Sequence, residues 1–76
     1  MRVAGITVPD SAIAELALRL HRSGEVALSR HVGRAFDQNR SELELDRQDF
    51  RPILAALEDA PPSLVPLRDA LRAVVG

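Results

Sequence analysis

One stretch decides the fold of this 76-residue chain: Asp10-Ser11-Ala12-Ile13-Ala14-Glu15-Leu16-Ala17-Leu18-Arg19-Leu20. Apolar side chains recur in it at the i, i+3, i+4, i+7 spacing of an amphipathic helix, at Ile13, Leu16, Ala17 and Leu20. Either Asp10 or Ser11 is suited to cap this helix. The other apolar residues widen the arc until only Glu15 and Arg19 are clearly polar. A helix that is apolar nearly all round belongs at the centre of a fold or in an interface.

A second helix is expected after Gly24, which lacks the Cβ that would clash in the left-handed position just past a helix end. The period predicts this helix over roughly Glu25–Gln38, with a buried stripe of Leu28, Val32, Ala35 and Phe36. Gly33 in its interior costs about 1 kcal/mol relative to Ala. It either permits a close helix crossing or is simply tolerated.

Two segments have strand character. Val3–Val8 is rich in β-branched residues and ends at Pro9, and Glu42–Asp46 alternates acid and Leu as a half-buried strand does. Each is the only evident partner of the other. Because an isolated two-stranded pair is marginal, helices are expected to pack against it.

Two further helices are expected in the C-terminal third. Phe50–Glu58 has the helical period, but either Asp46 or Asp49 can cap it, and Pro52 is tolerated only in a first turn. We expect an irregular first turn from Arg47. Ser63 can cap the fourth helix, whose stripe is Leu64, Leu67, Leu71, Val74 and Val75.

The predicted fold is therefore mainly α (α+β), one small domain over residues 1–76. It is a compact bundle of four short helices with a possible two-stranded β element, in the order β-α-α-β-α-α.

The composition argues against most kinds of chemistry. The chain has no Cys, Lys, Tyr or Trp, and Phe36 and Phe50 are its only aromatic residues, too few to stack single-stranded nucleic acid. His21 and His31 fall on different predicted helices and lack the spacing of a metal site. We expect no enzyme, no catalytic or metal-binding residue, no cofactor and no small-molecule substrate.

The N-terminal residues do not have the pattern of a secretory signal. Met1–Ile6 contains no long apolar run, and Ile13–Leu20 is far shorter than the ~20 residues that cross a bilayer. We expect a cytoplasmic protein without membrane contact.

Charge is unevenly distributed along the chain, whose net charge is -1. Residues Arg19–Arg40 hold five Arg and two acids, a net +3, and residues Ser41–Asp59 hold six acids and two Arg, a net -4. Either the two stretches neutralise each other within the monomer, at ~0–1 kcal/mol for each pair, or they form a surface directed at a partner or a second copy.

Two resemblances bear on function. Residues Arg2–Gln38 are expected to form a strand that ends in Val8-Pro9-Asp10, then a helix, Gly24 and a second helix. This order of elements resembles a ribbon-helix-helix DNA-binding protein. This resemblance implies a strand that pairs with its dimer mate in the major groove, with three groove-facing candidates, Arg2, Ile6 and Thr7. Glu25–Leu28 departs from the Ser- and Arg-rich helix start of that family, and the net charge adds no attraction to phosphate.

The C-terminal half is similar to small uncharacterised proteins of high-GC bacteria. The similarity is carried by Leu43-x-Leu45, Ile53-Leu54-Ala55-Ala56-Leu57-x-Asp59, Pro61-Pro62, Leu64 and Leu67-Arg68-x-x-Leu71. The use of Arg alone as the basic residue agrees with a GC-rich genome. The resemblance implies a compact helical fold and no activity.

These observations favour a non-enzymatic protein–protein interaction or regulatory module, expected as a homodimer, because a short chain with four amphipathic helices has apolar surface to spare. The candidate interface residues are Leu16, Leu18 and Leu20, expected to be buried, and Arg30 and Arg34, one turn apart. A ribbon-helix-helix-like regulator or antitoxin is the alternative, with nucleic acid disfavoured but not excluded. A regulatory subunit of a larger complex is the third possibility.

Overall fold

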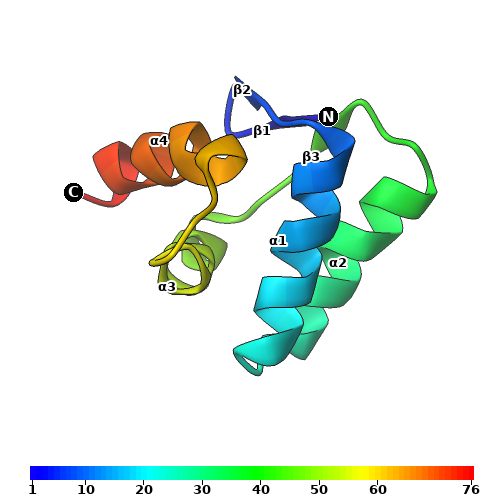
Figure 1. Cartoon of the computed structure of the whole chain (residues 1–76), viewed down its shortest axis with the longest axis horizontal. Helices are drawn as coiled ribbons and strands as arrows, with labels where there is room; N and C mark the ends of the chain where they lie inside the picture. The colour runs from blue at the N-terminus through cyan, green and yellow to red at the C-terminus, as the bar shows by residue number, and fades with distance from the viewer.

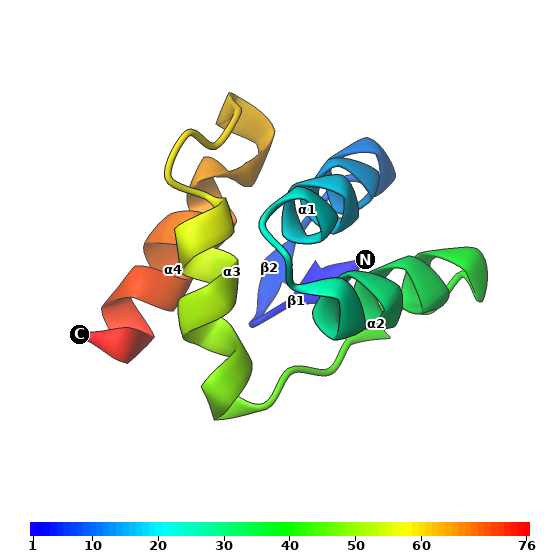
Figure 2. The same cartoon turned by 90° about the horizontal axis from the view of Figure 1, so that it is seen from below.

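The helices form two pairs with a small sheet beside them in the computed structural model, which describes residues 1–76 (Figure 1). Helices α1 (Asp10–Arg22) and α2 (Val26–Asp37) lie side by side and antiparallel. Helices α3 (Phe50–Ala56) and α4 (Val65–Val75) form the second pair, on the other side of the sheet from α2 (Figure 2). The mainly α fold with four helices is confirmed.

Helix α1 begins at Asp10 with Pro9 in the capping position, so neither Asp10 nor Ser11 caps it as expected. The carbonyl oxygen of Pro9 accepts the first helical hydrogen bonds, from the N–H groups of Ala12 and Ile13. The Asp10 carboxylate instead lies 4.0 Å from the terminal ammonium of Met1. Pro9 can hold this position because the residue before a helix contributes only its carbonyl oxygen to the first turn.

Helices α1 and α2 both end in a left-handed residue. Gly24, with φ +89°, donates to the carbonyl oxygen of His21, and the next N–H, that of Glu25, donates to Leu20 at 2.9 Å. This is the hydrogen-bond pattern of a Schellman motif, and the expected role of Gly24 is confirmed. Asn39, with φ +53°, ends α2 in the same way.

The sheet has three strands rather than two. The segment Val3–Val8 is not one strand, because β1 (Arg2–Val3) turns back into the antiparallel β2 (Ile6–Thr7). The turn residues Ala4 and Gly5 have φ of +50° and +80°, the left-handed geometry of a two-residue hairpin loop. Alanine is rare in that position, which is why the sequence did not predict the turn.

Strand β3 (Glu42–Leu43) pairs in parallel with β1, so the sheet order is β2-β1-β3. The expected pairing of the N-terminal segment Val3–Val8 with the central segment Glu42–Asp46 is confirmed, through β1 and β3. The expected strand over Glu42–Asp46 is too long, because the ladder ends at Leu43.

The chain enters α3 through a 3-10 turn, η1 (Arg47–Asp49), which confirms the expected irregular turn from Arg47. Asp46 and Asp49 form a capping box, in which the Asp49 carboxylate accepts the Asp46 backbone N–H at 2.9 Å. Pro52 falls in the first turn of α3, where no helical hydrogen bond is lost. The helix ends at Ala56, two residues before the predicted Glu58.

Ser63 does not cap the last helix. It lies inside a second 3-10 turn, η2 (Pro62–Leu64), and α4 begins directly after Leu64. Val74 is 54% exposed, so it is not part of the buried stripe expected for this helix.

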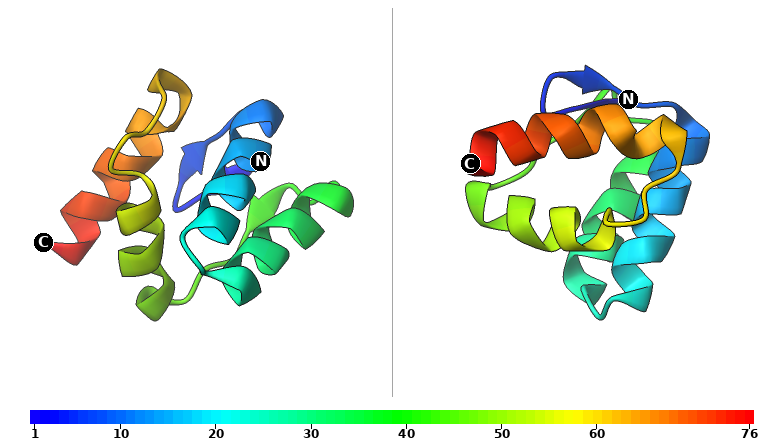
Figure 3. Two further views of the ribbon diagram at one scale, coloured as in Figure 1. Left: turned by 60° about the horizontal axis from the view of Figure 1, so that its bottom comes forward. Right: turned by 60° about the vertical axis from the view of Figure 1, so that its left-hand side comes forward.

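One apolar core joins all the elements. Every buried residue is apolar, and the set is Val3, Val8, Ala12, Ile13, Leu16, Leu20, Leu28, Val32, Ala35, Leu43, Ile53, Leu57, Leu64, Leu67 and Leu71. No helix combines the length and the apolar character needed to cross a bilayer. Figure 3 shows the arrangement of the two helix pairs and the sheet from two further directions.

Candidate protein-interaction surface

The three leucines predicted for burial separate into two groups. Leu16 and Leu20 are fully buried in the chain's own core, so they have no surface to offer a partner. Leu18 is 43% exposed in the single chain, so its burial requires a partner. It lies on the side of α1 that no other element covers, because the core of a chain this short reaches only one stripe of each helix.

Four large apolar side chains remain exposed at the surface. They come from three helices, and they are Leu18, Val26, Phe36 and Val74. Of these, Phe36 was expected in the buried stripe of α2. Exposed apolar side chains of this kind contribute area when a partner covers them.

Arg30 and Arg34 are both exposed on α2, one turn apart as predicted, and neither makes an ion pair within the chain. Arg34 also lines the surface groove described next. Arg30 lies outside the lining of that groove, on the neighbouring turn.

A groove runs along α2, between that helix and the segment from β3 to α3. One part has a volume of about 460 Å³ and four carboxyl groups in its lining, those of Glu25, Glu44, Asp46 and Asp49. The adjoining part has a volume of about 220 Å³ and is lined by Arg34, Arg40, Glu42 and Glu44, among others. His31 and Glu44 line both parts. We call this surface the α2 groove.

The two parts meet at a hydrogen bond between side chain and backbone. The Nε2 atom of His31 lies 2.6 Å from the carbonyl oxygen of Glu44. Because a carbonyl oxygen only accepts, Nε2 carries the hydrogen in this contact. The bond joins α2 to the chain immediately after β3, two residues that are thirteen apart in sequence and show no pattern that predicts their contact.

Internal ion pairs do not neutralise the two charged stretches. The ion pairs of the chain are three: Glu15 with Arg19 at 3.0 Å, Arg68 with Asp69 at 3.3 Å, and the Met1 ammonium with Asp10. None joins a residue of Arg19–Arg40 to a residue of Ser41–Asp59. The charges that line the α2 groove are therefore available to another molecule.

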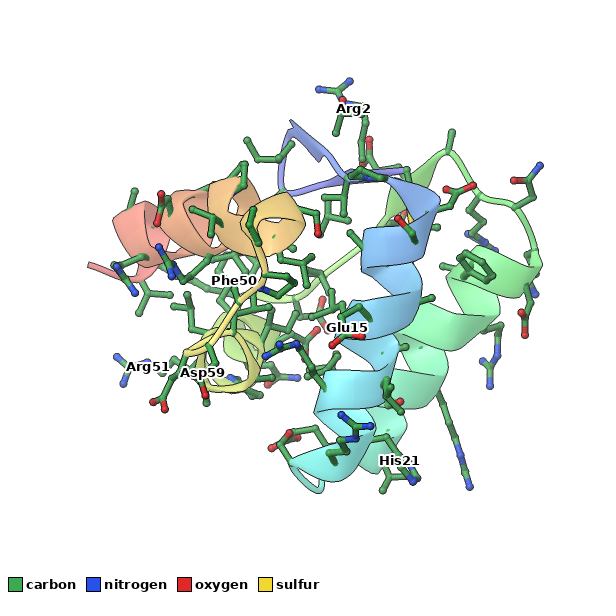
Figure 4. All side chains as sticks on the ribbon, in the orientation of Figure 1. Arg2, Glu15, His21, Phe50, Arg51 and Asp59 are labelled. Atoms are coloured by element: carbon green, nitrogen blue, oxygen red, sulfur yellow. The ribbon has the colours of Figure 1, made fainter.

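Strand β1 is paired on both of its edges. Arg2 lies opposite Thr7 on one side and opposite Glu42 on the other. A ribbon-helix-helix arrangement needs an N-terminal strand with an edge free for its dimer mate, and β1 has none. The ribbon-helix-helix resemblance implies that Arg2, Ile6 and Thr7 face the major groove of DNA. Arg2 and Thr7 are exposed and Ile6 is half-buried. The Arg2 side chain extends away from the sheet (Figure 4).

The acidic side chains of the α2 groove do not converge on one point. No group of three or more His, Cys, Asp or Glu side chains is placed to hold a metal ion. The arrangement is a surface that carries both positively and negatively charged side chains. Comparison of the chain with family models, with curated proteins and with solved structures gave no match.

Proposed function

We propose that this chain is a non-enzymatic interaction module of the cytoplasm that associates with a second copy of itself. The observation that carries the proposal is the set of opposite charges on α2 and on the β3–η1 segment, which lie beside each other and form no internal ion pair. A second copy supplies charges of both signs to the same surface.

Charges left unpaired on one surface favour association through their long-range field. Complementary fields speed encounter and select the register in which two surfaces meet. The four exposed apolar side chains add contact area, and a chain of 76 residues gains stability by covering them.

The test is the molar mass of the purified chain by light scattering and by sedimentation equilibrium, at tens of micromolar and in low salt. We expect a dimer whose dissociation constant rises with ionic strength, because salt screens exposed charges. A strict monomer under these conditions contradicts the proposal. A chain that is monomeric alone but recovered from its host with another protein would instead be the regulatory subunit of a larger complex.

A further inference from the structure

We propose that the α2 groove is the surface to which the second copy binds, with the two α2 helices antiparallel. This inference rests on the proposed self-association and adds to it the contact surface and its orientation. It is argued from the two ends of the groove, which carry different charge.

One end of the groove is acidic. It lies along the N-terminal half of α2, where Glu25 precedes the helix and Leu28 lines the groove with it. Three carboxyl groups from the opposite wall face the same space, those of Glu44, Asp46 and Asp49. None of the four groups belongs to an ion pair, although Asp46 and Asp49 accept backbone N–H groups within their capping box.

The other end carries the arginines. Arg34 and Arg40 line the groove beside the C-terminal half of α2. The Nε of Arg40 donates to the Gln38 side chain at 2.9 Å, which leaves its positive charge without a counter-ion. Two acids, Glu42 and Glu44, line this end as well.

A two-fold axis through the middle of the groove brings unlike ends together. The middle is the His31–Glu44 contact, which borders both parts. Rotation about an axis perpendicular to α2 at that point places the C-terminal half of one α2 against the N-terminal half of the other. The end that holds Arg34 and Arg40 in each copy then faces the acidic end of its mate, in two equivalent contacts.

A second copy fits this groove better than an unrelated basic segment does. A basic peptide would use the acidic end and leave the arginines of α2 without a partner. In an isologous contact the same surface of both copies takes part, so each end of the groove is paired in both copies and the dimer is closed. This is the commonest form of homo-oligomer.

The experiment reverses each end separately. The Arg34→Glu/Arg40→Glu variant and the Glu25→Arg/Glu44→Arg variant each place like charges opposite one another in a homodimer. We expect the dissociation constant of each to rise about tenfold or more, since close charge pairs at interfaces are strongly coupled. An equimolar mixture of the two variants pairs the reversed charges with one another, while Asp46 and Asp49 stay acidic, so we expect it to form a heterodimer that is tighter than either homodimer.

Control variants carry the same changes on the far side of the molecule. Arg51→Glu/Arg72→Glu and Glu58→Arg/Asp59→Arg alter exposed residues of α3, α4 and the segment after α3, and none of them lines the α2 groove. Figure 4 shows Arg51 and Asp59 on the side away from α2. Circular dichroism of every variant checks that it folds.

The outcomes separate this inference from the proposed function. If both reversal variants dimerise as the wild type does, the α2 groove is not the contact surface, and the proposed self-association still holds. Reversal variants that dissociate but do not recover on mixing overturn the antiparallel pairing. A wild-type chain that is monomeric at every salt concentration overturns both. If the wild type is monomeric and binds an oligo-arginine peptide, the groove binds a basic segment and not a second copy of the chain.

Discussion

The imidazole of His31 donates to the backbone carbonyl oxygen of Glu44 across 2.6 Å, and this single bond ties helix α2 to the chain beyond the last strand of the sheet. Glu44 directly follows Leu43, the residue at which the β1–β3 ladder ends. The side chain of a helix therefore takes the place of a strand partner at that carbonyl. The same contact divides the α2 groove into its acidic and arginine-bearing parts.

Removing this bond is expected to weaken the fold modestly. His31→Leu leaves the Glu44 carbonyl oxygen to solvent, and we expect the free energy of unfolding to fall by about 1 kcal/mol, the usual net value of one hydrogen bond. Urea denaturation at a fixed protein concentration measures it. His31→Gln, whose amide N–H can donate to the same carbonyl, is the control and is expected to lose less. Equal losses in both variants would show that packing of the ring, rather than its hydrogen bond, is what matters.

Gly33 is expected to be replaceable with a gain in stability. It lies inside α2, and a Cβ built there meets no atom within 4 Å. The open space removes the close-crossing explanation and supports simple tolerance. We expect Gly33→Ala to raise the free energy of unfolding by about 1 kcal/mol, the difference in helix propensity. An unchanged or lowered melting temperature at the same protein concentration would contradict this.

The hairpin turn holds a residue in a conformation that suits it poorly. Ala4 has φ +50°, a geometry that costs an L-residue roughly 1–2 kcal/mol. Asparagine tolerates the left-handed region and is favoured in this loop position. We therefore expect Ala4→Asn to raise the free energy of unfolding by roughly 0.5–1 kcal/mol, within the strain that it relieves. Ala4→Val is the contrasting variant, which is expected to destabilise the chain in the same thermal melts.

Two leucines on α1 are expected to respond very differently to truncation. Leu20 is fully buried, and Leu20→Ala leaves a cavity that costs about 2–5 kcal/mol. Leu18 is 43% exposed, and Leu18→Ala is expected to change the stability of the monomer by no more than about 0.5 kcal/mol.

The comparison needs protein concentrations low enough to keep the chain monomeric, because a dimer raises the apparent stability by mass action. Denaturant midpoints of the two variants then give the difference directly. Similar midpoints for Leu18→Ala and Leu20→Ala would show that α1 is oriented differently from the structure described above.

The expected burial of Leu16, Leu18 and Leu20 shows how far a pattern reaches. The spacing of α1 identifies a helix and one apolar stripe, and Leu16 and Leu20 lie on that stripe. Leu18 is equally apolar, but it points half a turn away from Leu16. Residue type alone does not reveal which side of a nearly apolar helix its neighbours will cover.

The candidate surface was predicted only in part. The separation of charge between Arg19–Arg40 and Ser41–Asp59 is visible along the chain, and so is the one-turn spacing of Arg30 and Arg34. The placement of residues from these two charged stretches on the two walls of one groove depends on how β3 packs beside α2. No local pattern carries that information.

The sequence by itself determined where the four helices lie and most of the residues in their buried stripes, because helical hydrogen bonds and side-chain spacing involve residues only three or four positions apart. It also determined the left-handed end of α1 at Gly24, which depends on one residue's lack of a Cβ. Tertiary structure alone decided the third strand, the parallel pairing of β1 with β3 and the contact between His31 and Glu44. The third strand comes from a local turn that places Ala4 in a left-handed conformation, and the other two features join residues that are distant along the chain. Their energies depend on loop closure and on the packing of a shared core, and no single segment contains either.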